Sequence, residues 1–414
     1  MFLKIQEDRR AFLVVIHALY KKTMKRAIVF GGGGSKGAYQ LGAWRALNEL
    51  GLEFEIATGT SIGSVNAGFY VQHDFEKCEK MWNTINSDML MKNSLEFNQS
   101  IDYYIENRET IIPFIKNYIT YRGADISPLK ILLASLCDEE KFFASKIDFA
   151  LMTTRFPSRN PHTVFKRDIR EGYLKSWILA SSSCFPAFPV CEIDGEKFID
   201  GGYCDNLPVD AAFKLGAETV IAIALKPLEN IRHSDNPLIK YIVPSRDLGS
   251  FLNFERGTLD KNIKAGYLDT MKAFNKLYGY KYSFKIKDTD FIFDLYRRVF
   301  LAIANFESVD DESWSLKSNA FPLTSFLSEK YKTAATPVEK MLQVLETAMT
   351  LLDFNDLRIY DVRTLVNEIA EAADNCALKR LRWRIEKAPD RARILKEDSA
   401  AIITAIFLNA VLKS

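Results

Sequence analysis

Apolar residues recur along the first two thirds of the chain in two spacings, one typical of buried strands and the other of helices. Short apolar runs at 27–30 and 56–58 predict strands. Each is followed by a glycine-containing turn and then by apolar residues three and four positions apart. A strand, a turn and a helix therefore occur twice in close succession. Paired units of this kind are typical of a parallel sheet covered by helices.

Further strands and helices are predicted before residue 286. The runs 148–154 and 219–225 indicate buried strands, and 192–199 indicates a hairpin because Asp194-Gly195 at its centre favours a tight turn. Covering helices are predicted at 75–85, 101–118 and 129–136. We therefore expect an α/β fold in which a mostly parallel central sheet lies between layers of helices.

Glycine is distributed unevenly and marks a change of architecture. All 20 glycines lie at or before Gly279. Tight turns between strands and helices need glycine, whereas a helical bundle does not. Beyond Gly279, the apolar spacing predicts helices at 291–306, 338–352, 362–373, 378–386 and 394–412. The predicted organisation is an N-terminal extension at 1–24, an α/β domain at 25–286 and an all-helical region at 287–414.

Composition and charge argue against several classes of protein. The 55 Lys and Arg residues nearly balance the 53 Asp and Glu residues, so no global field favours nucleic acid. The longest near-continuous apolar run, 11–20, is half of the roughly 20 residues that a membrane span needs. Six cysteines without a C-x-x-C pair fit a reducing compartment. We expect a cytoplasmic location, at most peripheral to a membrane, and no nucleic-acid partner.

The pattern Gly59-x-Ser61-x-Gly63 stands where the second predicted strand meets its helix. An exposed nucleophile needs such a tight turn, and glycines on both sides relieve crowding around it. The pattern alone is weak, and its position between a strand and a helix strengthens it. Ser61 is the predicted nucleophile, with Gly59 and Gly63 forming the elbow around it.

A glycine-rich loop, Gly32-Gly33-Gly34-Ser35-Lys36-Gly37, follows the first predicted strand at the equivalent place. Backbone N–H groups of such a loop can point at an anion near the positive end of a helix. Two anions fit: the transient oxyanion of acyl transfer, or a dinucleotide phosphate, because Gly32-x-Gly34-x-x-Gly37 matches the Rossmann fingerprint. The ATPase phosphate loop does not match, because Lys36 is followed by glycine rather than Ser or Thr.

Asp200-Gly201-Gly202 directly follows the predicted hairpin. A carboxylate at a strand end can project into the crevice where ligands bind, although Asp-Gly is also an ordinary turn. Ser61 needs a base, and a chain order of Ser61, Asp200 and His233 would allow a triad. His233 lies in the polar linker 229–237, which is typical of a solvated loop. A dyad of Ser61 and Asp200 is the simpler prediction.

Together the three motifs resemble the patatin-like phospholipases in order, content and spacing. The segments 180–186, 247–249 and 266–269 are similar to that family too, so the resemblance covers about 25–280. One departure is Pro189-Val190, where the family usually has two prolines. The region after Lys287 carries no such resemblance.

The resemblance implies a lipid acyl hydrolase that needs no cofactor and no metal. Ser61 would attack the ester carbonyl of a phospholipid or another acyl lipid while Asp200 accepts its proton. The oxyanion hole would be drawn from Gly32, Gly33, Gly34, Lys36, Gly37 and Ile62. No motif indicates the headgroup preference or the oligomeric state.

A basic segment at 379–396 holds eight Lys and Arg residues against Glu386 and Asp390. Such a segment can bind an anionic lipid surface, at about 1 kcal/mol per basic residue, or form a solvated helix face paired with acidic neighbours. Two other functions are compatible with the motifs. One is a nucleotide-binding regulator that uses the Gly32–Gly37 loop, and the other is an inactive scaffold that binds a partner.

Overall fold

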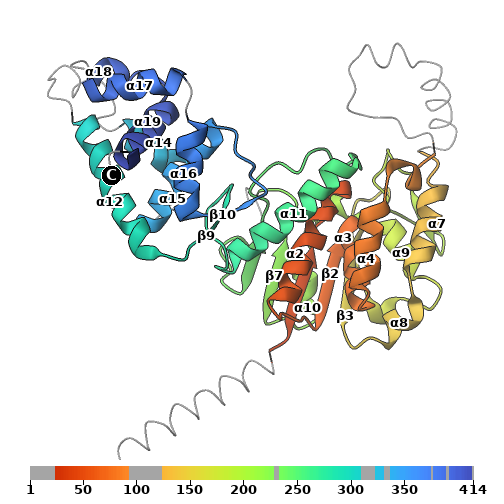
Figure 1. Ribbon diagram of the computed structural model, residues 1–414. Coiled ribbons are helices and arrows are strands. Elements are labelled where there is room, and N and C mark those ends of the chain that lie inside the picture. The colour runs from red at the N-terminus through yellow and green to blue at the C-terminus, as the bar shows by residue number, and fades with distance from the viewer. Residues whose placement is uncertain are drawn as a thin grey trace, which may run out of the picture. The chain divides into compact units, whose positions relative to one another are not determined.

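The structure is a computed structural model that describes residues 24–92, 124–227, 233–308, 322–330, 336–373, 376–387 and 391–412. The chain divides into two compact units, Met1–Thr270 and Met271–Ser414 (Figure 1). This division precedes the domain boundary expected at 286, and the three-part domain assignment stays a prediction. Nearly all of the expected N-terminal extension, and the expected helix at 101–118, lie outside the described residues.

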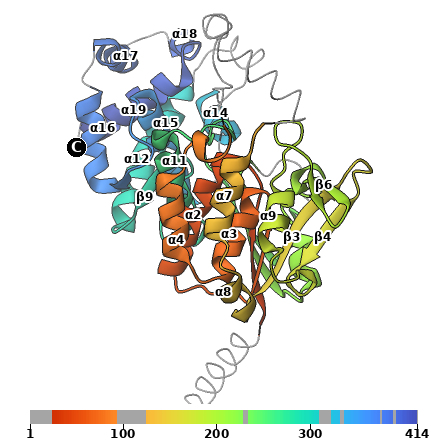
Figure 2. The ribbon, with the colours of Figure 1, turned by 90° about the vertical axis from the view of Figure 1, so that its right-hand side faces the viewer.

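The described part of the first unit contains an eight-stranded sheet with the order β5-β6-β3-β2-β1-β7-β8, in which β4 also pairs with β3. β1, β2, β3, β7 and β8 run parallel to one another, whereas β4 and β6 run antiparallel to β3, and β5 runs antiparallel to β6. Figure 2 shows β3, β4 and β6 side by side. The mostly parallel sheet is confirmed. The bounds are β1 Arg26–Phe30, β2 Ile56–Thr60, β3 Asp148–Arg155, β4 Pro161–Phe165, β5 Cys191–Ile193, β6 Glu196–Asp200, β7 Thr219–Ile223 and β8 Ile239–Ile242.

The predicted hairpin is present and has the expected turn. Asp194 and Gly195 both have positive φ angles, of 52° and 81°. This combination matches the right-handed twist of the two strands, which is why Asp-Gly is favoured there. The turn sets Asp200 as the last residue of β6.

Helices cover both faces of the sheet, as predicted. Ala27 and Val29 of β1 pack with Val209 and Ala212 of α10 on one face of the sheet. Because successive strand residues point to opposite faces, the residues of β1 between and after them face the helices on the other side. Figure 1 shows α2, α3 and α4 side by side in front of the strands. The bounds are α2 Ala38–Glu49, α3 Ile62–Val71, α4 Phe75–Thr84, α7 Ser127–Leu136, α8 Glu139–Ala144, α9 Leu174–Ser181, α10 Val209–Lys214 and α11 Arg256–Ala273.

The second unit is helical, as predicted, and has its own core. Residues 402–408 of α19 are buried on every side, which is typical of a helix at the centre of a bundle. α12, α15 and α17 pack against it. The bounds are α12 Thr289–Glu307, α14 Pro322–Lys330, α15 Pro337–Leu351, α16 Val362–Ala372, α17 Cys376–Lys387, α18 Arg391–Ile394 and α19 Ser399–Leu412. Within the described ranges, no helix combines the length and hydropathy required to cross a bilayer.

Three details of this unit differ from the prediction, and the first is that α14 was not among the expected helices. The single helix expected at 394–412 is divided into α18 and α19, because the carboxylate of Asp398 accepts the N–H of Ala401 and caps a new helix. A short parallel pair, β9 Ser283–Lys285 and β10 Ile359–Asp361, also joins the helices. Three-residue strands carry too few residues to show a period.

Candidate functional site

Ser61 occupies the turn between β2 and α3. Its φ and ψ angles are 55° and −128°, a conformation that costs a residue other than glycine about 1–3 kcal/mol. A Cβ on Gly59 would lie 2.2 Å from the Gly63 carbonyl oxygen, and one on Gly63 would lie 2.1 Å from the Phe30 carbonyl oxygen. Both predicted elbow glycines therefore stand where the backbone leaves no room for a side chain.

Sheet pairing brings Asp200 to the same turn. β4 runs along one edge of β3, so β2 and β6 share the opposite edge. Thr60 at the end of β2 pairs with Met152, and Asp200 at the end of β6 pairs with the next residue, Thr153. The two strands thus meet end to end on β3, with Ser61 and Asp200 at the junction.

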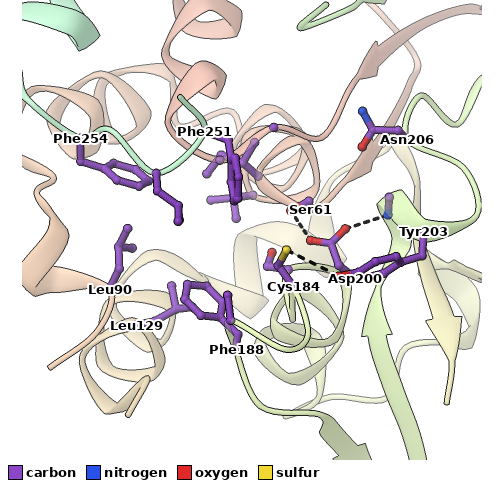
Figure 3. Close-up of a pocket in the computed structure, with 18 residues that line it drawn as sticks. Ser61, Leu90, Leu129, Cys184, Phe188, Asp200, Tyr203, Asn206, Phe251 and Phe254 are labelled. Atoms are coloured by element: carbon purple, nitrogen blue, oxygen red, sulfur yellow. Dashed lines mark hydrogen bonds between the residues drawn. The ribbon is translucent and has the colours of Figure 1, made fainter. Parts of the chain in front are cut away.

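The side chains of Ser61 and Asp200 are in direct contact (Figure 3). The Ser61 hydroxyl donates to Oδ2 of Asp200 at 2.6 Å, and the N–H of Gly202 donates to Oδ1 at 2.7 Å. Asp200 is only 6% exposed. Both carboxylate oxygens are held by donors, so the side chain has a defined orientation toward the serine.

Burial makes Asp200 a stronger base than an ordinary aspartate. Its pKa rises from 3.8 to about 6, because removal from water disfavours the ionised form. The hydrogen bonds from Ser61 and Gly202 favour the ionised form and so limit the rise in the pKa. At neutral pH the carboxylate is charged, desolvated and placed to accept a proton.

The glycine-rich loop approaches the junction from the end of β1. Gly33, Gly34 and Ile62 line the same cavity as Ser61. The N–H of Gly32 donates to the Asn206 carbonyl oxygen, and the N–H of Lys36 donates to the Gly33 carbonyl oxygen. Of the predicted loop residues, Gly32, Lys36 and Gly37 do not line the cavity. Gly37 packs closely on Ile62 and Trp82, where a Cβ would lie 2.7 and 2.8 Å from their side-chain atoms.

A largely apolar cavity of about 280 Å³ opens beside Ser61. Five of its side chains are Leu90, Leu129, Phe188, Phe251 and Phe254, which face one space in Figure 3. They come from loops and helices that are far apart in sequence. The amino-acid pattern did not single them out, because each looks like any other buried apolar residue.

The described histidines have partners elsewhere. His233 contacts Asp210 at 2.8 Å on an exposed part of the surface. His162 stacks on Phe198 and lies near Arg155. The acceptor of the Ser61 hydroxyl is Asp200, so the structure brings together the pair that the sequence favoured over the triad.

Two residues that support the junction were not singled out from the sequence. The side-chain amide of Asn206 donates to the Gly32 carbonyl oxygen at 3.0 Å. The hydroxyl of Ser181 accepts the N–H of Ser61 at 2.9 Å. Ser181 lies in the segment 180–186, which carried part of the family resemblance but has no motif that states a role.

Comparison with known proteins bears on the same region. Residues 28–213 match the family model named patatin-like phospholipase, and this segment contains Ser61 and Asp200. The first unit contains a patatin-like phospholipase domain. The patatin-like domain includes the elbow, the glycine-rich loop and β6.

The curated relatives are much longer proteins. Lysophospholipase NTE1 of Mycosarcoma maydis is 25% identical over 208 residues, which is 50% of this chain and 10% of that protein. Patatin-like phospholipase domain-containing protein 7 of Mus musculus is 31% identical over 204 residues, 48% of this chain and 13% of that protein. The crystal structure of VipD from Legionella pneumophila has 12% identity and a TM-score of 0.40, covering 94% of this chain and 91% of that chain.

Proposed function

We propose that the chain is a lipid acyl hydrolase in which Ser61 is the nucleophile and Asp200 is the general base. The contact of 2.6 Å between the Ser61 hydroxyl and the buried Asp200 carboxylate carries this proposal. The apolar cavity beside Ser61 suits a fatty-acyl chain. The patatin-like domain and the lysophospholipase named above support an acyl lipid as the substrate.

In the first half-reaction, Oγ of Ser61 attacks the ester carbonyl carbon while its proton passes to Oδ2 of Asp200. The tetrahedral intermediate then collapses, the C–O bond to the alcohol breaks, and the proton moves from Asp200 to the leaving oxygen. The acyl group stays on Ser61. A carboxylate with a pKa near 6 can both take and return this proton near neutral pH.

In the second half-reaction, water attacks the acyl-serine carbonyl and gives a proton to Asp200. Collapse of the second tetrahedral intermediate returns that proton to Oγ of Ser61 and releases the fatty acid. The same carboxylate therefore serves both steps, and no histidine is needed.

The negative charge of each intermediate needs backbone donors. We assign this role to the N–H groups of Gly33, Gly34 and Ile62, because these residues line the cavity beside Ser61. The N–H groups of Gly32 and Lys36 are bound to carbonyl oxygens and are not assigned. One donor of this kind contributes about 2.7–4 kcal/mol to the barrier reduction.

The nucleotide-binding alternative has weaker support from the loop geometry. The N–H of Ser35, which a phosphate would need, donates to the Phe251 carbonyl oxygen at 2.8 Å. A Cβ on Gly34 would lie 2.1 Å from that same oxygen, so the segment around Phe251 covers this part of the loop.

Labelling with a fluorophosphonate ester tests the proposed function directly. Wild-type protein should label at Ser61 and release fatty acid from a lysophospholipid. Ser61→Ala should abolish labelling, and Asp200→Asn should lower ester turnover by about 100-fold or more while the protein remains folded. Equal labelling of wild type and Ser61→Ala would contradict the proposal, and full activity of Asp200→Asn would point to a different base.

We also propose that α17 docks on an anionic lipid surface. Its apolar residues Leu378 and Leu381 are buried, and Lys379, Arg380 and Lys387 are exposed on the helix surface. Trp383, on the same helix, is 64% exposed. A tryptophan among basic residues is typical of helices that lie at the lipid headgroups.

A further inference from the structure

The end of α9 contacts the backbone of both members of the proposed dyad. The Ser61 N–H donates to the side-chain oxygen of Ser181 at 2.9 Å. Two residues later, the Ser183 carbonyl oxygen accepts the N–H of Asp200 at 2.8 Å. One short segment, 181–183, therefore binds the nucleophile through a side chain and the base through its main chain.

The Ser181 hydroxyl forms a bridge rather than a single bond. It accepts from Ser61 and donates to the Met152 carbonyl oxygen at 2.7 Å, and the residue is completely buried. Met152 is the last residue of β3 that pairs with β2, and Thr153 after it pairs with Asp200. The bridge thus ties the Ser61 turn to the point on β3 where β2 and β6 meet.

The Ser61 turn depends on such bonds because its backbone is strained. With φ at 55°, the residue persists only if its surroundings hold it. Its carbonyl oxygen accepts the N–H of Ser64 at 2.8 Å and the Ser64 hydroxyl at 2.6 Å. On the other side of the residue, the N–H is held by Ser181.

We propose that Ser181 is a positioning residue whose hydroxyl holds the Ser61 backbone in the conformation that keeps Oγ against Asp200. This inference rests on the proposed acyl hydrolase function. Loss of the hydroxyl leaves the Ser61 N–H without its acceptor and frees the turn to relax away from the carboxylate. A displacement of about 1 Å at a reacting group can reduce a rate about 100-fold.

The chain offers a matched control two residues away. Ser183, just beyond α9, is also completely buried, and its hydroxyl donates to the carbonyl oxygen of Leu179 in the last turn of that helix. Its contact with Asp200 is made by the main chain, so Ser183→Ala retains it. Ser181→Ala and Ser183→Ala delete the same atom from the same segment, and only the first removes a bond to the nucleophile.

The test compares the two variants with wild type on a soluble p-nitrophenyl ester. Ser181→Ala should lower kcat about 10-fold or more with KM within about twofold, and should slow fluorophosphonate labelling to the same extent. The acid limb of its pH profile should move to higher pH, because the Ser61 hydrogen bond lowers the pKa of Asp200. Ser183→Ala should stay within about twofold of wild type in kcat.

Stability is measured alongside, because a buried hydroxyl can also matter for folding. If Ser181→Ala is not folded at the assay temperature, Ser181→Cys keeps the shape with a weaker hydrogen-bonding group and should give an intermediate kcat. Labelling of folded Ser181→Ala or Ser181→Cys at the Ser183→Ala rate would overturn the role of Ser181. Absence of labelling in wild type itself would instead overturn the proposed function, and this inference with it.

Discussion

The buried carboxyl group of Asp200 sets the expected pH dependence of the reaction. Its pKa is raised to about 6 mainly by burial, and only the ionised form can accept the Ser61 proton. We expect kcat/KM on a soluble ester to fall tenfold per pH unit below about pH 6 and to be level from pH 7 to 8. A pH–rate profile measures this. An acid limb centred near pH 4 would mean that Asp200 is not desolvated in the working enzyme.

The same carboxyl group should lower the stability of the fold above pH 6. Since the pKa of Asp200 is about 6 when folded and near 3.8 when unfolded, the folded state holds the proton more tightly. Stability is therefore lost as the pH rises from about 4 to 6. A rise of about two in the pKa of Asp200 corresponds to a loss of about 3 kcal/mol in the free energy of unfolding.

Asp200→Asn removes this charge and should be more stable than wild type above pH 6. The gain in the free energy of unfolding should approach about 3 kcal/mol at pH 8. It should vanish below pH 4, where the Asp200 carboxyl group of the wild type is protonated in both the folded and the unfolded state. Chemical denaturation of both proteins at pH 4 and pH 8 gives the comparison. An equal effect at the two pH values would show that the change in stability does not come from ionisation.

The elbow glycines are expected to tolerate no side chain. A Cβ on Gly63 would lie 2.1 Å from the Phe30 carbonyl oxygen, a backbone atom that cannot move aside cheaply. Gly63→Ala should abolish fluorophosphonate labelling and lower the midpoint of thermal unfolding. Gly257→Ala is the matched control, because nothing lies within 4 Å of its Cβ and alanine favours the helix by up to about 1 kcal/mol. Similar melting curves for the two variants would contradict this steric account.

At the level of elements, α15 holds the segment that precedes β9. Glu346 of this helix is buried, and its carboxylate accepts the N–H groups of Tyr280, Lys281 and Tyr282 at 2.6, 3.3 and 3.2 Å. One negative charge thus satisfies a row of backbone donors. Burial raises the pKa of Glu346, and these three donors oppose the rise.

Replacing Glu346 by glutamine turns one acceptor oxygen into a donor that faces backbone N–H groups. We expect Glu346→Gln to lower the free energy of unfolding of the helical unit by about 2 kcal/mol or more. The same change at Glu329, which is exposed on α14, should cost less than about 0.5 kcal/mol. Urea titration of the full chain, followed by circular dichroism, measures both. Equal midpoints would mean that water replaces the carboxylate without cost.

At the scale of the whole molecule, the two units have separate cores and are assigned separate tasks. If α17 docks on lipid, Lys379→Gln, Arg380→Gln and Lys387→Gln together should weaken binding to phosphatidylserine-containing vesicles roughly 100-fold, at about 1 kcal/mol per charge. Hydrolysis of a soluble ester should not change. Vesicle co-sedimentation and a spectrophotometric assay give the two readings.

The control for this prediction lies in the first unit. Lys214, Lys261 and Lys264 are exposed on α10 and α11, and their replacement by glutamine removes the same total charge. That variant should bind vesicles within about twofold of wild type. Equal losses in the two triple variants would show that net charge, rather than the α17 surface, governs binding. Binding of wild type should also weaken as salt is raised.

Local rules were enough to predict much of this architecture from the amino-acid order. The strands before the glycine-rich loop and before Ser61, the Asp194-Gly195 hairpin and helices such as α2, α4 and α15 follow from spacing and from backbone sterics, which act between near neighbours. The pairing of Ser61 with Asp200 was predicted from their motifs and from the lack of a well-placed histidine. The strands β4 and β8 were not predicted, because their residues show no clear alternation.

Tertiary structure alone decided the chemistry around the site. The pKa of Asp200 depends on burial by segments remote in sequence. The N–H groups of Gly32 and Ser35 are occupied by the carbonyl oxygens of Asn206 and Phe251, more than 170 residues away along the chain. The apolar cavity and the Ser181 bridge likewise join residues that no local pattern relates. The sequence by itself determined which groups could react, since that is a matter of residue type. Their distances, solvation and hydrogen-bond partners arise only when the chain packs.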